Sequence, residues 1–143
     1  MSLQMEFDFA AAHAVPLPPV ALARRNRGQV AYLCGRAAEE AVARHYQRGG
    51  YRLLEERWRC QSGEIDLIFG RGDAIVVVEV KASRSHARAA EHLSDRQLQR
   101  IFRAASEYLG HCPKGQLTEL RVDLATVNGF GEIETREGVF ADF

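Results

Sequence analysis

Residues 74–81, Ala-Ile-Val-Val-Val-Glu-Val-Lys, form the strongest strand pattern in this chain of 143 residues. Branched side chains dominate the segment, and both alternating faces are apolar until Glu79. A strand that is apolar on both faces is typical of the centre of a sheet with cover on each side. Its end carries a carboxylate, Glu79, and an ammonium, Lys81, so charged groups are expected at one end of a buried strand.

A second strand is predicted at residues 64–69, and the tight connection at residues 70–73 joins it to the first as a hairpin. Side chains alternate across a strand, so Glu79 and Lys81 share one face of theirs. The hairpin lays the two strands side by side. We therefore expect Asp66, in the middle of the preceding strand, to lie on the same face as Glu79 and near the same end of the sheet.

The remaining elements follow from periodicity and turn residues. Residues 29–48 and a segment that starts at Ser94 have apolar positions at helical spacing, and Ser94 with Gln97 fits a capping box. Residues 82–93 show no period and predict a loop. Further strands are predicted at residues 51–58, 120–127 and 132–135. This order predicts an α/β fold with a central mixed β-sheet flanked by helices, an α/β/α sandwich.

The buried faces of the two helices are predicted from the same periodicity. In the helix at residues 29–48 the apolar positions are Val30, Leu33, Cys34, Ala37, Ala38, Ala41, Val42 and His45. In the helix after Ser94 they are Leu98, Ile101, Phe102, Ala105, Tyr108 and Leu109. Residues 1–26 show no such period and hold Pro16, Pro18 and Pro19. We predict a loosely ordered arm over residues 1–26 and a single domain over residues 27–143.

Composition indicates a globular chain that works inside the cell. Hydrophobic residues make up 46% and charged residues 27% of the sequence, which is typical of soluble domains. No apolar run approaches the roughly 18 residues that a membrane-spanning helix needs, and the N-terminus lacks the regions of a secretory signal. Three cysteines, Cys34, Cys60 and Cys112, argue against a disulfide framework. We expect a cytoplasmic protein with no membrane association.

Charge is unevenly spread although the formal net charge is zero. A neutral chain argues against a protein that simply coats nucleic acid. Residues 81–103 nevertheless hold six basic residues against two acidic ones, and the planar fork of arginine suits phosphate. The side chains expected to border a nucleic-acid site are Arg84, Arg88, Arg96 and Arg100. An arginine-rich composition that reflects only the genome explains the same pattern.

Asp66 and Glu79 carry the candidate chemistry. A buried carboxylate is costly unless it is paired or bound to a metal, and two close carboxylates repel each other until a cation joins them. Oxygen ligands of this kind suit Mg²⁺ or Mn²⁺. Lys81 would then stabilise charge that develops on a phosphate, or orient the attacking water. The same three residues also fit an ion-pair network without a metal.

The spacing of these residues resembles a known signature. Asp66, twelve intervening residues and then Glu79-Val80-Lys81 resemble the PD-(D/E)xK pattern of restriction-endonuclease-like nucleases. The longer segments at residues 58–68, WRCQSGEIDLI, and 78–81, VEVK, resemble the YraN family, small bacterial proteins described as endonuclease-like. The resemblance runs from about residue 35 to residue 123 and implies a restriction-endonuclease-like α/β/α sandwich.

Two positions depart from the superfamily or family pattern. Ile65 stands where the superfamily usually has proline, as it does in this family generally. Ala82 and Ser83 follow Lys81, where the family commonly has Thr or Tyr and then Arg.

The resemblance implies roles for three further residues. The acid on the family's first helix falls on Glu39, although periodicity alone does not choose Glu39 over Glu40. The carbonyl of Val80 would add a metal ligand. The family's glutamine falls on Gln97, which the resemblance places among the nucleic-acid contacts, although the capping box also explains this position locally.

Three other residues near these segments have structural explanations. Glu64 either supports Asp66 or is only the exposed acid of a turn. Asp123 is expected to pack or pair structurally. Trp58 is expected in the core or at its rim.

Three functions are compatible with these patterns. The first is an Mg²⁺-dependent nuclease that acts on DNA or RNA. The second is a nucleic-acid-binding module of the same fold with little activity, which acts with a protein partner or as a homodimer. The third is an assembly protein in which the charged cluster is only an ion-pair network. Fold alone does not choose among them.

Overall fold

The computed structural model describes residues 35–139, and the elements below belong to that range. A leading helix is present at residues 35–48. It is followed by β1 (Arg52–Cys60), β2 (Gly63–Arg71), β3 (Ala74–Ala82), α3 (His86–Glu91), α4 (Asp95–Leu109), a 3₁₀ turn (Gly115–Leu117), β4 (Leu120–Val127) and β5 (Ile133–Arg136). The predicted arm at residues 1–26 and the start of the predicted first helix at residues 29–34 lie outside the described residues.

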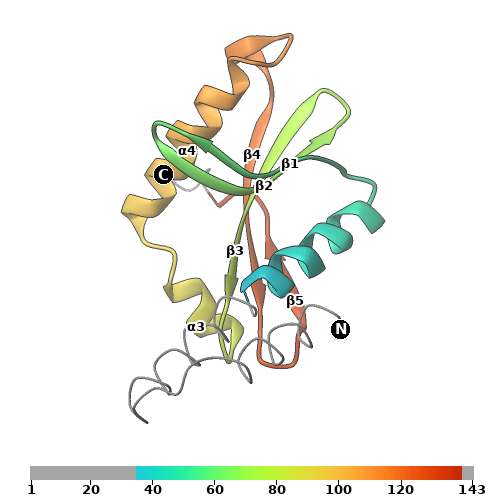
Figure 1. The fold of residues 1–143 in the computed structure, drawn as a ribbon, viewed down its shortest axis with the longest axis vertical. Helices are drawn as coiled ribbons and strands as arrows, with labels where there is room; N and C mark the ends of the chain where they lie inside the picture. The colour runs from blue at the N-terminus through green and yellow to red at the C-terminus, as the bar shows by residue number, and fades with distance from the viewer. Residues whose placement is uncertain (1–34, 140–143) are drawn as a thin grey trace, which may run out of the picture. The chain divides into compact units, whose positions relative to one another are not determined.

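The strands form one mixed sheet in the order β1-β2-β3-β4-β5 (Figure 1). The pairs β1–β2 and β2–β3 are antiparallel hairpins, β3 and β4 run parallel, and β4–β5 is a third antiparallel pair. The parallel pair needs a crossover, and the helices α3 and α4 supply it. Strand β3 therefore lies at the centre of the sheet, as its apolar sequence predicts.

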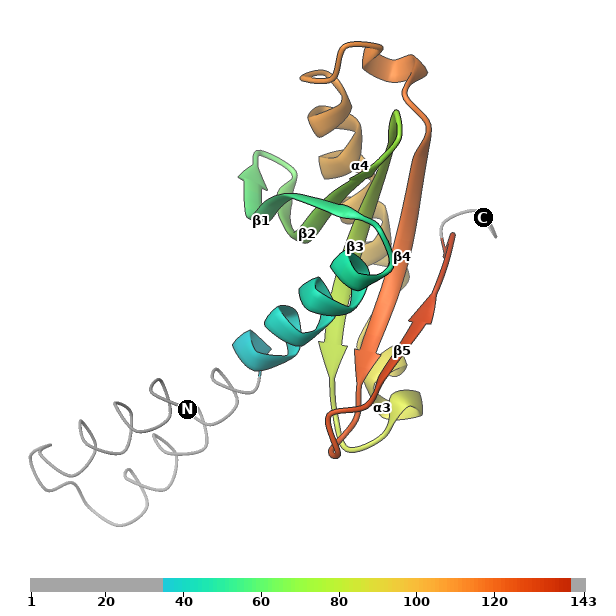
Figure 2. The ribbon, with the colours of Figure 1, turned by 90° about the vertical axis from the view of Figure 1, so that its right-hand side faces the viewer.

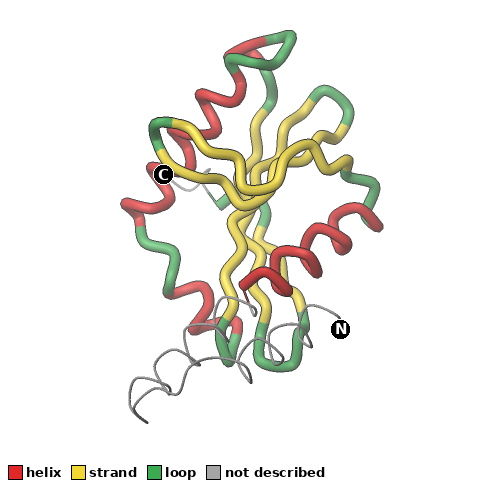
Figure 3. Tube along the Cα trace, in the orientation of Figure 1, coloured by secondary structure: helices red, strands yellow, loops and turns green. Residues whose placement is uncertain are grey.

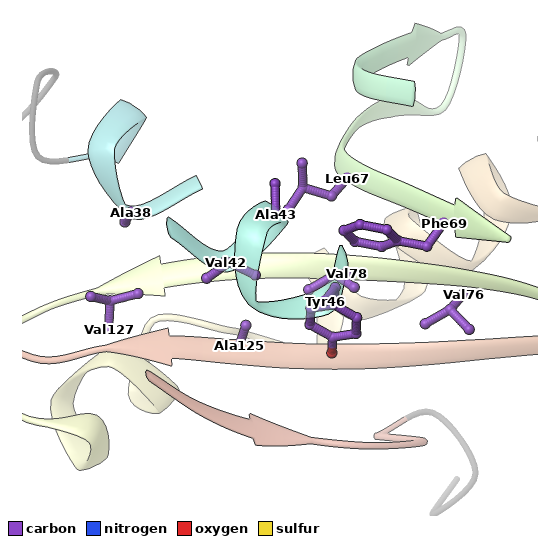
Figure 4. Packing of buried hydrophobic residues seen from close by; sticks show 10 residues of the cluster. All are labelled: Ala38, Val42, Ala43, Tyr46, Leu67, Phe69, Val76, Val78, Ala125 and Val127. Atoms are coloured by element: carbon purple, nitrogen blue, oxygen red, sulfur yellow. The ribbon is translucent and has the colours of Figure 1, made fainter. Parts of the chain in front are cut away.

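Helices cover both faces of the sheet, which confirms the predicted α/β/α arrangement (Figures 1 and 2). The leading helix packs Ala38, Val42 and Tyr46 against one face, where the Tyr46 and Phe69 rings stack with centroids 4.8 Å apart (Figure 4). Helix α4 packs on the other face, against β-strand residues that include Ile68. Burying these side chains stabilises the fold at roughly 25 cal/mol per Å² of apolar surface.

The predicted buried faces are correct in outline and wrong at their margins. Ala37 and His45 of the leading helix are exposed, and Tyr46, which was not predicted, is buried. In α4, Phe102 is 37% exposed and Ala104 is buried instead. In both helices most of the predicted buried positions hold, and the differences lie at the edge of the apolar stripe. The sheet against which each helix packs decides which of these edge residues face inward.

A loop was predicted for residues 82–93, and this prediction is wrong for part of the segment. The segment contains the short helix α3 at residues 86–91 (Figure 3). The Ser85 side chain accepts a hydrogen bond from the Arg88 amide and so caps its first turn. Ala89 is the buried residue of this helix. A helix with one small buried side chain gives no apolar period in the sequence.

The two central hairpin strands separate near Asp66. Their ladder ends at the pair Leu67–Val78, so the backbone beyond that point no longer pairs strand to strand.

Within the described residues, no helix is long and apolar enough to cross a membrane.

Candidate metal centre

Glu79 lies near the end of β3 with only 5% of its surface exposed. Its Oε1 atom accepts a hydrogen bond from Nε2 of Gln97 at 3.1 Å, and it lies 3.2 Å from the Lys81 ammonium. Glu79 and Lys81 are two residues apart on one strand, so the strand period places them on the same face. The neutral amide of Gln97 and the ammonium of Lys81 meet the same carboxylate oxygen.

Asp66 lies beside Glu79, on the neighbouring strand. Its Oδ2 atom accepts a hydrogen bond from the Val80 amide at 2.8 Å. Because the β2–β3 ladder stops at Leu67, the side chain takes the place of the backbone carbonyl that would otherwise continue it. The carboxyl groups of Asp66 and Glu79 interact directly with each other. The mutual influence of the two acids on their pKa values favours the prediction that they share a face and a sheet end, and their role as metal ligands stays a prediction.

The two carboxyl groups hold protons more tightly than ordinary ones. Burial first, and the neighbouring Asp66 second, raise the pKa of Glu79 to about 8, although Lys81 acts in the opposite direction. Burial is also the main cause that raises the pKa of Asp66, and the charge of Glu39 adds to it against the Val80 amide and Lys81. Two acids therefore share a part-buried space with one lysine, which leaves an excess of negative charge when both ionise.

Glu39 contributes to this site from the leading helix. Its Oε2 atom accepts hydrogen bonds from Nε and Nη2 of Arg57 at 3.0 and 2.8 Å. Its charge influences Asp66, whereas Glu40 is exposed. The structure thus favours Glu39 over Glu40, a choice that periodicity left open.

Arg57 is a neighbour of the site that the sequence analysis did not single out. It has a φ of 50°, in the left-handed region, which costs a residue with a Cβ of the order of 1 kcal/mol. The pairing of β1 with β2 is irregular a few residues earlier, between Leu53 and Glu55. An arginine in a charged strand segment gives no local signal of this conformation.

Gln97 combines a local and a tertiary role. Its amide donates to the Ser94 hydroxyl oxygen at 3.1 Å, as the capping box predicts. Its side chain, however, points to Glu79 instead of returning to the Ser94 amide. The cap therefore accounts for Ser94, and the contact with Glu79 accounts for the side chain of Gln97.

The residues predicted to bind nucleic acid differ in their contacts with the carboxylate pair. Of the residues predicted to contact nucleic acid, Gln97 donates a hydrogen bond to Glu79. The side chains of Arg84, Arg88, Arg96 and Arg100 are exposed, and within residues 35–139 no hydrogen bond joins them to Asp66 or Glu79. Their role in binding remains a prediction.

Glu64, Trp58 and Asp123 make contacts that support the fold. Glu64, at the start of β2, lies 3.6 Å from Arg59 of β1 as an exposed ion pair, which favours the exposed acid next to the turn over a support for Asp66. Trp58 is partly buried against Tyr108. Asp123 is fully buried and hydrogen bonded, as expected of a structural acid.

The residues at this site can be tested against the needs of a divalent cation. No group of three or more His, Cys, Asp or Glu side chains suited to a metal occurs in the described part of the chain. Mg²⁺ does not require one, because it keeps several waters and is commonly held by one or two carboxylates and a phosphate. Asp66 uses Oδ2 for Val80, and Glu79 uses Oε1 for Gln97 and Lys81. The donor set fits a hard cation with few protein ligands.

Comparison with known proteins places the chain in a family. Residues 38–127 match the model of the uncharacterised protein family UPF0102. The chain belongs to this family. A UPF0102 protein of Ruegeria pomeroyi is 51% identical over 115 residues, 80% of this chain and 94% of the relative. One from Cereibacter sphaeroides is 52% identical over 114 residues, 80% of this chain and 97% of the relative.

The UPF0102 match confirms the predicted YraN resemblance. A more distant UPF0102 protein, of Roseobacter denitrificans, is 40% identical over 124 residues, 87% of this chain and 96% of the relative. The region matched by the family model contains all the residues that meet at the carboxylate pair, which are Glu39, Arg57, Asp66, Glu79, Lys81 and Gln97.

Proposed function

We propose that this protein is a metal-dependent, endonuclease-like enzyme that hydrolyses phosphodiester bonds in nucleic acid. The observation that carries the proposal is the pair Asp66 and Glu79, two interacting, poorly exposed carboxyls whose pKa values are both raised. Among the described residues, Lys81 beside them is the positive charge that forms an ion pair with Glu79. A pair of acids that is destabilised by its own charge suits a site that receives a cation.

Asp66 and Glu79 would hold Mg²⁺ or Mn²⁺, and the carbonyl of Val80 would add a third oxygen. When bound, the cation would offset the carboxylate charges and draw electron density from a phosphate. Gln97 and Lys81 fix one oxygen of Glu79, and the Val80 amide fixes one oxygen of Asp66. These contacts orient both carboxylates before a ligand arrives, which lowers the ordering cost of binding it.

Lys81 is the residue we assign to the phosphate. Its ammonium orients a water molecule for attack on phosphorus and stabilises the negative charge that develops on the phosphoryl oxygens. The water oxygen forms a new bond to phosphorus as the bond to the leaving oxygen breaks. The water gives up one proton to solvent, and the leaving oxygen takes one proton from solvent. Glu39, paired with Arg57, keeps the region beside Asp66 negative.

A cleavage assay tests this proposal. The full chain is incubated with Mg²⁺, Mn²⁺ or EDTA and a panel of single-stranded, duplex, flapped and branched DNA and RNA. We expect cleavage with metal that EDTA abolishes, and a loss of about 10²-fold or more in Asp66→Asn, Glu79→Gln and Lys81→Met. Glu64→Gln is the matched control. Glu64 lies on β2, as Asp66 does, but it pairs with Arg59 in solvent. Activity that survives Asp66→Asn and Glu79→Gln would overturn the proposal.

A nucleic-acid-binding module with little activity is the alternative. The small number of carboxylates at the site and the net charge of zero favour it, as does the set of exposed arginines at residues 84–100. Such a protein would act in the cytoplasm with a protein partner or a second copy of itself. It would bind the substrates of the panel at low salt and leave them uncut, with an affinity that falls when two of these arginines are neutralised.

A further inference from the structure

The turn between β4 and β5 presents an aromatic ring to solvent. Phe130 is 89% exposed. Among the described residues, the other large apolar side chains with high exposure are Leu117, also at 89%, and Phe102 at 37%. An exposed phenyl ring gains nothing for the fold, because its apolar surface stays in water. The ring is therefore open to contact with a ligand.

The backbone under Phe130 is firmly held. The Asn128 side-chain oxygen accepts from the amides of Phe130 at 3.0 Å and Glu132 at 2.9 Å, and its nitrogen donates to the Glu132 carboxylate at 2.9 Å. The Gly129 amide donates to the Arg84 carbonyl at 3.1 Å. A ring on such a turn loses little backbone entropy when it binds a ligand.

The turn lies at the same end of the sheet as the candidate site. Strand β4 pairs with β3 through Lys81–Thr126 and Ala82–Val127, and the Ser83 amide then donates to the Val127 carbonyl. Figures 1 and 3 show the β4–β5 turn next to the end of β3. At about 3.3 Å per residue, Ser83 lies roughly 13 Å beyond Glu79.

We propose that Phe130 stacks on an unpaired base of the same strand whose phosphate is held at Asp66 and Glu79. The proposal rests on the proposed function and narrows its substrate class to strands with unpaired bases next to the cut. Aromatic side chains stack on any base whose face is open, whereas the bases of an intact duplex cover one another. Arg84, tied to this turn through its carbonyl, supplies the neighbouring phosphate contact.

The surroundings of Phe130 favour a base over a protein surface. Its neighbours are Gly129, Gly131, Asn128 and Glu132, which add no apolar area around the ring. A stable protein interface buries about 800 Å² on each partner, far more than one ring supplies. A net charge of zero also limits what phosphate contacts alone contribute to affinity, so a stacking contact would matter here.

Binding measurements with matched variants test the proposal. The probes are a labelled single strand of twenty deoxythymidines, the same strand with abasic sites in place of its bases, and a blunt hairpin duplex of equal charge. All are measured with Ca²⁺ by fluorescence anisotropy. Phe130→Ala should weaken binding to the first probe about 5- to 150-fold and leave the other two unchanged. Phe130→Trp should keep or improve the affinity.

Leu117→Ala is the control, because Leu117 is equally exposed but precedes β4, at the opposite end of that strand. It should leave all affinities unchanged. Equal affinities of wild type and Phe130→Ala for the single strand, in a protein that cleaves or binds nucleic acid, overturn the stacking proposal alone. A changed oligomeric state of Phe130→Ala in light scattering, with unaltered affinities, overturns it in favour of a protein contact. A wild-type protein that binds no probe overturns both this proposal and the proposed function.

Discussion

Two carboxylates are buried on the neighbouring strands β3 and β4, on opposite faces of the sheet. Their hydrogen-bond partners and the charges around them differ. Asp123 of β4 is fully buried on the side of the leading helix. It accepts hydrogen bonds from Tyr46 Oη at 2.8 Å, Arg121 Nε and Nη2 at 2.9 and 2.8 Å, and the Gly138 amide at 3.1 Å. Glu79 of β3 lies on the side of α4, with Gln97 and Lys81 on one oxygen and a second acid beside it.

The difference separates a structural acid from a candidate functional one. Asp123 and Arg121 cancel in charge, and burial followed by Asp123 raises the pKa of Tyr46 so that it stays a neutral donor. The sum over Asp66, Glu79 and Lys81 is one negative charge when all ionise, with Glu39 already matched by Arg57. A satisfied acid stabilises the fold, whereas an acid with an excess of like charge stores free energy that a cation can release.

The largest expected effect comes from breaking the satisfied acid. Asp123→Asn removes the charge that faces Arg121 and a share of four hydrogen bonds. We expect a loss of about 3 to 5 kcal/mol in the free energy of unfolding, because the other members of a buried network are left unpaired. Urea unfolding followed by circular dichroism measures it. Tyr46→Phe, which removes one donor, should cost about 1 kcal/mol. If Asp123→Asn loses less than the roughly 1 kcal/mol expected of Tyr46→Phe, the network is dispensable.

In the protein without metal, Glu79→Gln should raise the free energy of unfolding at neutral pH, whereas Asp123→Asn lowers it. The folded pKa of Glu79, about 8, lies above its ordinary value of 4.5, so the native state binds the proton more tightly than the unfolded chain. Stability is therefore highest below pH 4.5 for this group and falls as the pH rises toward 8, by about 3 kcal/mol between pH 5 and pH 8. Urea unfolding across that range should show this slope in wild type and a flatter one in Glu79→Gln.

Equal pH slopes in the two proteins would mean that Glu79 carries no such strain. The comparison between the two acids would then lose its basis. Glu64→Gln is again a useful control, since its solvent-exposed pair with Arg59 should leave the slope unchanged.

Addition of metal tests the same strain from the other side. Mn²⁺ or Mg²⁺ at a hundredfold excess over its dissociation constant should stabilise the wild type by about 2.7 kcal/mol. Asp66→Asn should abolish that response and leave the metal-free protein as stable or more stable, because it removes a repelling charge at nearly constant shape. Thermal melts of both proteins with and without Mn²⁺ give the comparison. No shift in wild type, together with a lower melting temperature for Asp66→Asn, would favour an ion-pair network.

Much of this site follows from short-range rules. The alternation of side chains and the tight connection at residues 70–73 suffice to bring Asp66 and Glu79 together, as predicted. Strand β4 matches its predicted range of residues 120–127 because it is flanked by clear turn residues. Patterns that depend on a strand period of two and on local turns can be read without the rest of the fold.

What could not be predicted depends on contacts between distant elements. The left-handed conformation of Arg57 is imposed by β1 and β2 and by its partner Glu39, which lies 18 residues away. Helix α3 has one buried residue, so its formation rests on a cap and on packing against the sheet and not on an apolar period. The side chain of Gln97 had a sufficient local explanation, and its contact with Glu79 became visible only in the folded chain.

Gln97 gives the smallest and most specific prediction. Its amide serves the cap of α4 and its side chain serves Glu79, so the two roles can be separated by two variants. Gln97→Ala keeps the backbone cap and removes the donor to Oε1, and Ser94→Ala removes the cap and keeps that donor. Each should cost about 1 kcal/mol of stability. Only Gln97→Ala should weaken the Mn²⁺-induced rise in melting temperature, because Glu79 then loses the amide that orients it. If Ser94→Ala weakens the metal response equally, the position of the whole helix matters and the individual contact does not. If neither variant changes it, Lys81 alone orients Glu79.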